Sequence, residues 1–335
     1  MPLKEVLGHH RLVALIARSV SRGSLPPSLI FSGPAGVGKR LMAVAAAQLL
    51  NCTNRVGEGS EIDACGVCAA CTRIARGVHS DVIIVEPGDN GSIKIEQIRD
   101  VVDKTAYRPF EGRCRVVIVD GAEALVPAAQ NALLKTLEEP PAASIFLLVT
   151  PQPDLLLATV RSRCPCLRFG PLAAEDVVAA LMARGRTETE ARAVAATADG
   201  SLRRALESAA GDLVQGREIA EQVLVRAAAT DDPRRRIDGA KELLTKTGAG
   251  ASDREQLAVH LRSMGSLLRD AELLATEADV RGLANPDRRQ TLERLAQAYR
   301  GDRGLRAFTA VDRALAALDR NASVKIVADW LMLQL

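Results

Sequence analysis

The chain has 335 residues, which is enough for two or three domains with hydrophobic cores of their own. Hydrophobic residues make up 47% of it but aromatic residues only 2%, so we expect cores of Ala, Leu and Val in a mostly helical protein with one sheet-containing domain. The 44 basic and 41 acidic residues give a net charge of +3, which argues against a protein that binds nucleic acid through its overall charge.

The sequence has no apolar run of about 18 residues, the length that a membrane-spanning helix needs. Its first five residues, MPLKE, do not resemble a signal peptide. We therefore expect a cytoplasmic protein that makes no contact with a membrane. The odd number of cysteines, seven in all, favours a metal site in a reducing compartment over disulfides.

In chain order, apolar spacing first predicts a helix from Leu3 to Arg22. Short apolar runs then predict strands at residues 28–32, 82–85, 115–120, 145–150 and 166–169. Helices are expected between them, at residues 41–50, 93–104 (with Ser92 as the cap) and 127–137. Strands that alternate with helices predict an α/β domain with a parallel sheet.

Ligands of such sheets bind beyond the carboxyl ends of the strands. The loop after the first strand, Asp120 after the third and Thr150 after the fourth all lie at such ends. We therefore expect them to form one site.

Residues 33–40, GPAGVGKR, match the first seven positions of the phosphate-binding loop G-x-x-x-x-G-K-[ST]. Glycines let the backbone N–H groups of such a loop point inward, and the lysine reaches the outer phosphates. The loop residues expected at a nucleotide are Gly33, Gly36, Gly38, Lys39 and Arg40. Arg40 stands where a magnesium-binding hydroxyl belongs, so the loop is suited to hold ATP or ADP and poorly equipped to hydrolyse it.

Asp120 stands at the strand end where P-loop enzymes place a magnesium-binding acid. In one subclass of these enzymes a Glu follows that Asp and orients the attacking water. Here Gly121 follows, and Glu123 comes two positions late. We therefore interpret Asp120 as a residue of a vestigial nucleotide site, and expect no intrinsic ATPase activity.

Four cysteines are clustered after the P-loop helix, with the spacing C-x12-C-x2-C-x2-C. They are Cys52, Cys65, Cys68 and Cys71. Four thiolates close a tetrahedral zinc shell and leave no open position, so the pattern predicts a structural Zn²⁺. The remaining Cys114, Cys164 and Cys166 are interpreted as small hydrophobic residues.

After residue 170 the strands stop, and everything that follows has a helical pattern. Three helices are expected from Leu172 to about Ala228, with breaks near Gly185 and at residues 199–200, and a domain boundary near residues 231–233.

Arg163 and Arg203 each allow two readings: surface charge, or a guanidinium that faces a nucleotide. The chemistry of the residues does not decide between them.

Residues 131–141, NALLKTLEEPP, and residues 156–164, LLATVRSRC, resemble the clamp-loader branch of the AAA+ ATPases. The four-cysteine segment is similar to that of the bacterial subunits of this branch. The resemblance implies an α/β AAA+ domain at 1–170 with a zinc insertion at about 51–76, a three-helix lid at 171–232 and an all-α collar at 233–335.

The resemblance also implies roles. Arg163 matches the arginine finger that enters the ATP site of a neighbouring motor subunit, Thr150 matches a sensor at the strand end, and Arg203 matches the lid sensor. The implied partners are the motor and clamp-opening subunits of a five-membered ring, the sliding clamp and the phosphates of primer–template DNA. Such a ring serves the replicative DNA polymerase.

Two other readings remain. The first is an ATP-hydrolysing motor subunit of the same family, against which Arg40 and Gly121 argue. The second is a zinc-dependent nucleic-acid-binding protein. The balanced charge and the small number of aromatic residues argue against it.

Overall fold

The computed structural model describes residues 2–198, 200–207, 210–230, 232–244, 250–276, 283–320 and 322–335. They form two compact units, Met1–Leu172 and Ala173–Leu335. Among the described residues, no helix is both long and apolar enough to cross a membrane.

The first unit is built on a parallel five-stranded sheet with the strand order β2-β3-β4-β1-β5. The strands are β1 (Ser28–Ser32), β2 (Val82–Val85), β3 (Arg115–Asp120), β4 (Ser144–Thr150) and β5 (Cys166–Arg168). All five lie where the apolar runs predict strands, so the α/β prediction is confirmed.

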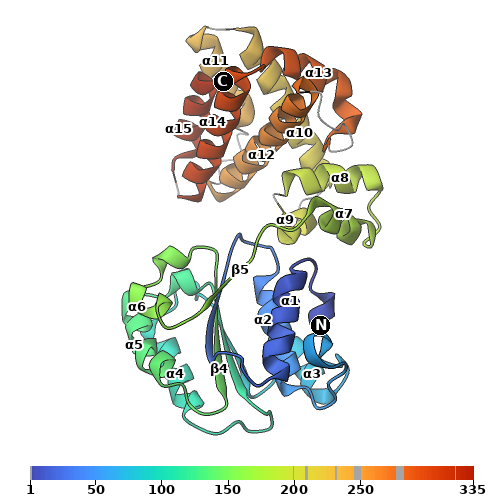
Figure 1. Ribbon diagram of the computed structural model, residues 1–335. Coiled ribbons are helices and arrows are strands. Elements are labelled where there is room, and N and C mark those ends of the chain that lie inside the picture. Colours follow the sequence, from blue (N-terminus) through green and yellow to red (C-terminus); the bar gives the residue numbers. More distant parts are fainter. Residues whose placement is uncertain are drawn as a thin grey trace. The chain divides into compact units, whose positions relative to one another are not determined.

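Helices cover both faces of this sheet, as Figure 1 shows. They are α1 (His10–Ser21), α2 (Lys39–Asn51), α3 (Ala69–Ala75), α4 (Ile95–Thr105), α5 (Pro127–Glu138) and α6 (Ala158–Arg161), joined by short 3-10 turns at η1 (Leu3–Glu5), η2 (Gly59–Glu61), η3 (Ala122–Ala124) and η4 (Pro153–Leu155). Successive strand residues enter opposite cores: Phe31 packs in the core under α1 and α2, and Ile30 in the core under α4 and α5.

The predicted helix from Leu3 to Arg22 is wrong in its first third, from Leu3 to His9. The chain forms the turn η1, breaks at Gly8 and His9, which both have positive φ (63° and 51°), and only then starts α1. The reason is a distant contact: the backbone N–H groups of Leu3 and Lys4 donate to the carboxylate of Asp63, at 2.8 and 3.0 Å.

The predicted cap of α4 is also wrong. Ser92 bonds to Asn90, and the residue before the helix is Lys94, whose N–H donates to Oε1 of Gln97 at 2.9 Å. The glutamine three residues into the helix therefore satisfies the helix start, because its side chain reaches back to the preceding backbone.

A buried carboxylate fixes the loop between α4 and β3. Asp81 is 0% exposed and accepts hydrogen bonds from the N–H groups of Phe110, Glu111 and Gly112 at 2.7–2.8 Å. The guanidinium of Arg115 donates to it at 2.9 Å. Burial opposes ionisation, but these donors outweigh it and lower the pKa of Asp81 to about 2.

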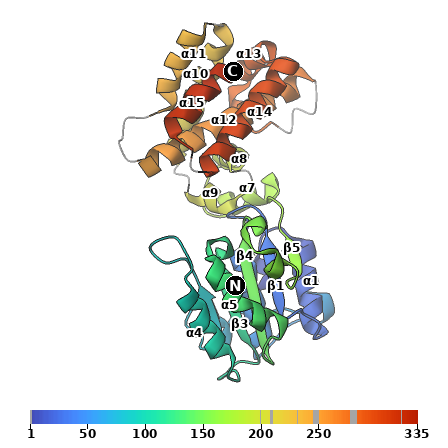
Figure 2. The same ribbon diagram turned by 90° about the vertical axis from the view of Figure 1, so that its left-hand side faces the viewer.

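The second unit is entirely helical in its described part. Its elements are α7 (Ala174–Met182), α8 (Glu188–Thr197), α9 (Leu202–Glu207), α10 (Ala210–Ala229), α11 (Pro233–Leu243), α12 (Gly250–Ala275), η6 (Pro286–Arg288), α13 (Arg289–Ala298), α14 (Asp302–Asp319) and α15 (Val324–Gln334). Helix α12 packs against α10, α13 and α14 (Figure 2).

The stretch 172–228 contains four described helices where the sequence predicts three. The fourth, α10, buries Ala220, Val223 and Leu224 in the core that α11–α15 share. Residue 199 of the predicted break and residue 231 of the predicted boundary lie outside the described residues. The division of this unit into lid and collar at residue 232 stays a prediction.

Candidate nucleotide site and metal centre

The carboxyl ends of the central strands meet at one edge of the sheet. In the register of the sheet, Ser32 pairs with Thr150, and Asp120 pairs with Val149. The loop that follows β1, Asp120 and Thr150 therefore lie together.

The P-loop is shaped by glycines that no other residue can replace without strain. Gly33 has φ 139°, and a Cβ built there would lie 2.1 Å from the carbonyl oxygen of Phe169. Gly38 has φ 102° and directly precedes α2. Because L side chains rarely adopt these angles, the sequence must place glycine there for the chain to turn into the helix.

Lys39 folds back onto its own loop. Its Nζ donates to the carbonyl oxygens of Gly33 and Pro34, both at 2.6 Å, and the residue is 5% exposed. Burial lowers the pKa of Lys39, while the charges of Glu123 and Asp120 oppose that shift. The ammonium group thus lies inside the loop, where a phosphate oxygen would compete with the two carbonyls for it.

Arg40 occupies the place that the motif reserves for a hydroxyl, and its guanidinium binds both nearby acids. It donates to Oδ2 of Asp120 at 3.0 Å and also to Oε1 of Glu86. Sequence reasoning missed Glu86, although it directly follows β2 just as Asp120 ends β3. Asp120, at the position where P-loop enzymes bind magnesium, is therefore paired with a cation of the chain itself.

The residues after Asp120 do not present a carboxylate where the motif needs one. Gly121 has φ 78°, and a Cβ there would lie 3.2 Å from Cγ of Pro87. Glu123 lies in the turn η3, and its Oε2 is buried with no hydrogen-bond partner among the described residues.

Thr150 and Arg203 differ in their surroundings. Thr150 is fully buried, and its Oγ1 accepts a hydrogen bond from the N–H of Gln152 at 3.1 Å, so it supports the turn after β4. Arg203 lies on α9 in the second unit, donates to Glu207 at 2.7 Å and has 75% of its side-chain surface exposed. The sensor roles of both residues stay predictions.

Arg163 follows α6 and is held at the surface of the first unit. Its Nε donates to Oε1 of Glu138 on α5 at 2.7 Å, and its Nη1 donates to the carbonyl oxygen of Thr159 at 2.7 Å. The side chain keeps 33% of its surface exposed. Sequence reasoning did not single out Glu138.

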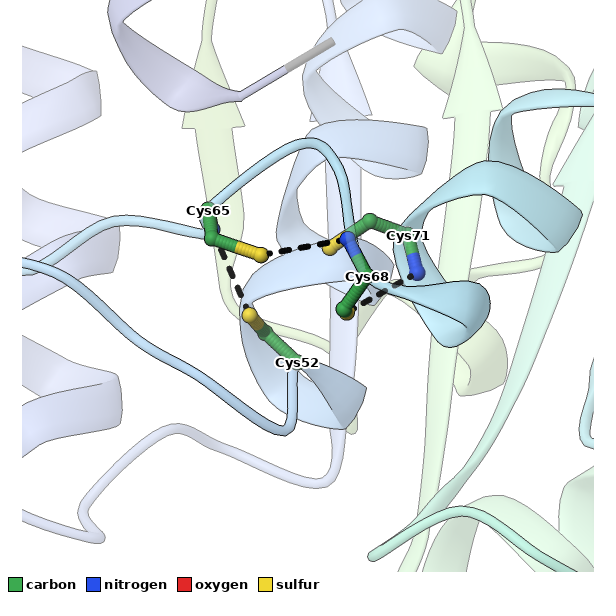
Figure 3. Close-up of side chains that lie close together, drawn as sticks. All are labelled: Cys52, Cys65, Cys68 and Cys71. Atoms are coloured by element: carbon green, nitrogen blue, oxygen red, sulfur yellow. Dashed lines mark hydrogen bonds between the residues drawn. The ribbon is translucent and has the colours of Figure 1, made fainter.

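The four clustered cysteines form a candidate metal centre (Figure 3). The sulfur atoms of Cys52, Cys65, Cys68 and Cys71 all lie within 4.8 Å of one another. Tetrahedral zinc with Zn–S bonds of about 2.3 Å requires sulfur atoms a little under 4 Å apart, so small movements would close the shell. Cys52 directly follows α2, Cys68 caps α3 and Cys71 lies in the first turn of α3, which means that helix ends position three of the four ligands.

Hydrogen bonds favour the thiolate form of one of these cysteines. Burial alone would raise the pKa of Cys68, but hydrogen bonds from Thr53 and from the N–H of Cys71 lower it to about 5. The N–H groups of Cys65 and Cys68 also donate to the sulfur atoms of Cys52 and Cys65, at 3.3 and 3.4 Å. Burial, in contrast, raises the pKa of Cys52 and of Cys71. The fit of the cluster to a metal ion therefore rests on the close approach of its four sulfur atoms.

The other cysteines stay apart from the cluster. Burial raises the pKa of both Cys114 and Cys164 to about 11, so both behave as the small hydrophobic residues that the sequence predicts. Cys166 is exposed and its sulfur lies 3.0 Å from Oγ of Ser32, so that prediction is wrong for Cys166.

Residues 8–173 match the family model described as DNA polymerase III, delta subunit. The DNA polymerase III subunit tau of Salmonella typhimurium is 36% identical over 208 residues, which cover 60% of this chain and 32% of that protein. The DNA polymerase III subunit delta' of Pseudomonas aeruginosa is 38% identical over 152 residues, 45% of each chain. This chain therefore matches between 32% and 45% of the length of these relatives.

Among solved structures, a DNA polymerase III gamma subunit-related protein of Thermotoga maritima is similar over 96% of this chain and 97% of that one. The identity is 17% and the TM-score is 0.40. This similarity is too weak to carry any conclusion.

Proposed function

Because the chain belongs to the clamp-loader family of DNA polymerase III subunits, we propose that it is a subunit of the delta-prime type, which keeps the AAA+ fold without hydrolysing ATP itself. The observation that carries this proposal is the pairing of Arg40 with Asp120. In an ATP-hydrolysing subunit the position of Arg40 is a metal-binding hydroxyl and Asp120 is free to hold magnesium.

The loop itself supports nucleotide binding without turnover. It keeps Lys39 and the N-terminus of α2, which together attract phosphate. It lacks the metal-binding hydroxyl, and Gly121 stands where the water-orienting carboxylate belongs. ATP or ADP bound here would stabilise the conformation of the subunit and would not be hydrolysed.

Arg163 supplies the chemistry of the subunit in this proposal. Its guanidinium is partly exposed at the surface of the first unit, and it is the residue that enters the ATP site of an adjacent motor subunit. There it stabilises the negative charge that develops during phosphoryl transfer. The partners are the gamma/tau motor subunits and delta in a cytoplasmic five-membered ring, which loads the sliding clamp on primer–template DNA through phosphate contacts.

We further propose that the four-cysteine cluster holds a structural Zn²⁺. Four thiolates leave no coordination position open for a substrate, so the ion would stabilise the excursion between α2 and α3 and take no part in catalysis.

A motor subunit of the gamma/tau type is the second candidate, because tau of Salmonella typhimurium is similar over a longer stretch of this chain than delta' of Pseudomonas aeruginosa. Phosphate release by the purified chain in the presence of ATP and magnesium separates the two. Background rates support the delta-prime type. Magnesium-dependent turnover that the Lys39→Ala substitution abolishes would establish the motor type instead.

A further inference from the structure

We propose that Arg40 takes the place of the magnesium ion in this site, so that the site binds a nucleoside diphosphate or triphosphate free of metal. The inference rests on the proposed nucleotide binding and adds that the nucleotide binds without magnesium. A P-loop site ordinarily takes its nucleotide with Mg²⁺.

The residues present do not fit that ion. Magnesium in such sites is held by one or two carboxylates, a hydroxyl, phosphate oxygens and water. Here the hydroxyl is missing, and the two carboxylates at the strand ends, Glu86 and Asp120, are both bound by the guanidinium of Arg40.

The position of Arg40 matters more than the strength of its ion pairs. The side chains of Arg40 and Glu86 are about half exposed, so solvent weakens each pair. Arg40, however, lies in the first turn of α2, directly after Lys39. A magnesium ion that displaced the guanidinium from both acids would still lie beside its positive charge.

The charges that face one another here are two cations, Lys39 and Arg40, and three carboxylates, Glu86, Asp120 and Glu123. A guanidinium binds phosphate oxygens through two parallel hydrogen bonds, so Arg40 can neutralise a phosphate group while it remains anchored to the strand ends. Arg40 thereby offers the phosphates one positive charge, where a magnesium ion supplies two.

The test measures the affinity of the full chain for a fluorescent ADP in excess Mg²⁺ and in EDTA, for the wild type and for Arg40→Thr. Magnesium should make ADP bind no more tightly to the wild type, because it withdraws free ADP from solution. In Arg40→Thr, which restores the hydroxyl and releases both acids, magnesium should tighten binding by about tenfold or more. A wild type that binds ADP about tenfold more tightly in magnesium, or a variant that magnesium leaves unaffected, would overturn the inference.

A second measurement does not depend on nucleotide. Titration with Mn²⁺, followed by electron paramagnetic resonance, should show one more bound ion in Arg40→Thr than in the wild type, and Arg40→Thr/Asp120→Asn should lose that ion. Equal Mn²⁺ binding by the wild type and Arg40→Thr would contradict the role of Arg40. Absence of ADP binding under every condition would instead refute the proposed nucleotide binding, while the Mn²⁺ titration would still decide whether Arg40 excludes a metal ion from the two carboxylates.

Discussion

Arg163 and Glu138 are joined within one subunit: Nε of the arginine donates to Oε1 of the glutamate at 2.7 Å. The pair links the segment after α6 to the last residue of α5. If Arg163 acts on the ATP of a neighbouring subunit, its guanidinium is held in a defined position beforehand. It must then release Glu138 in order to bind a phosphate.

Replacement of this finger should slow the assembled complex and leave the subunit folded. Arg163→Ala removes the guanidinium that the proposal places at the neighbour's ATP, so hydrolysis at that site should fall by a factor on the order of 10³. Arg161→Ala is the matched control, because Arg161 is a nearby surface arginine paired with Asp154. ATPase assays of the reconstituted ring measure both, and equal rates for the two variants would remove the assignment.

The four-cysteine cluster should contain one zinc ion per chain. Elemental analysis of the purified protein should find it, and Cys68→Ser should release it because three ligands do not close the shell. Cys166→Ser serves as the control, since Cys166 lies outside the cluster and is exposed. Stable wild-type protein without metal would contradict the prediction.

The carboxylate of Asp81 should make stability depend on acid pH. Folding lowers the pKa of Asp81 from 3.8 to about 2. The contribution of Asp81 to the free energy of unfolding is therefore complete above pH 3.8, and it is lost as the pH falls toward 2. Asp81→Asn should cost about 3 kcal/mol at neutral pH, because it leaves Arg115 buried without its counter-charge.

Urea unfolding at neutral and acid pH measures this effect. Asp100→Asn is the control, since Asp100 is 62% exposed in a pair with Lys104 and its loss should change stability by about 0.5 kcal/mol or less. An Asp81→Asn variant as stable as this control would show that the hydrogen bonds to Asp81 contribute little.

Glycine at residue 33 should be required for folding as well as for nucleotide binding. Gly33→Ala places a Cβ 2.1 Å from the carbonyl oxygen of Phe169, so the unfolding free energy should fall by at least about 2 kcal/mol. Gly170→Ala is the matched control, because no atom lies within 4 Å of the Cβ that it adds. Thermal unfolding compares them, and similar melting temperatures would mean that the backbone of Phe169 moves aside.

Local sequence was sufficient to predict the sheet and the edge where the site forms. Apolar runs such as Val82–Val85 are buried strands, and the parallel connections then bring Asp120 and Thr150 to the P-loop. The partners of charged side chains could not be predicted in the same way. Glu86 is 46 residues from Arg40 and Glu138 is 25 residues from Arg163, and only the folded chain determines which acids they meet.

A long-range contact also explains why the helix predicted at the beginning of the chain is wrong. A helical pattern runs through its first residues, yet the helix breaks at Gly8 and His9. The competing contact comes from Asp63, which offers its carboxylate to the N–H groups of Leu3 and Lys4. Long-range bonds of this kind leave no periodic signal in a sequence.

Asp63 connects the start of the chain to the cysteine cluster. It stands two residues before Cys65 and accepts a hydrogen bond from the N–H of Leu3, which is 60 positions away in the sequence. A chelator that emptied the cysteines would loosen the loop that carries this carboxylate. The amide protons of Leu3 and Lys4 would then exchange with deuterium faster. Mass spectrometry of the N-terminal peptide would in this way report whether a distant ion is in place.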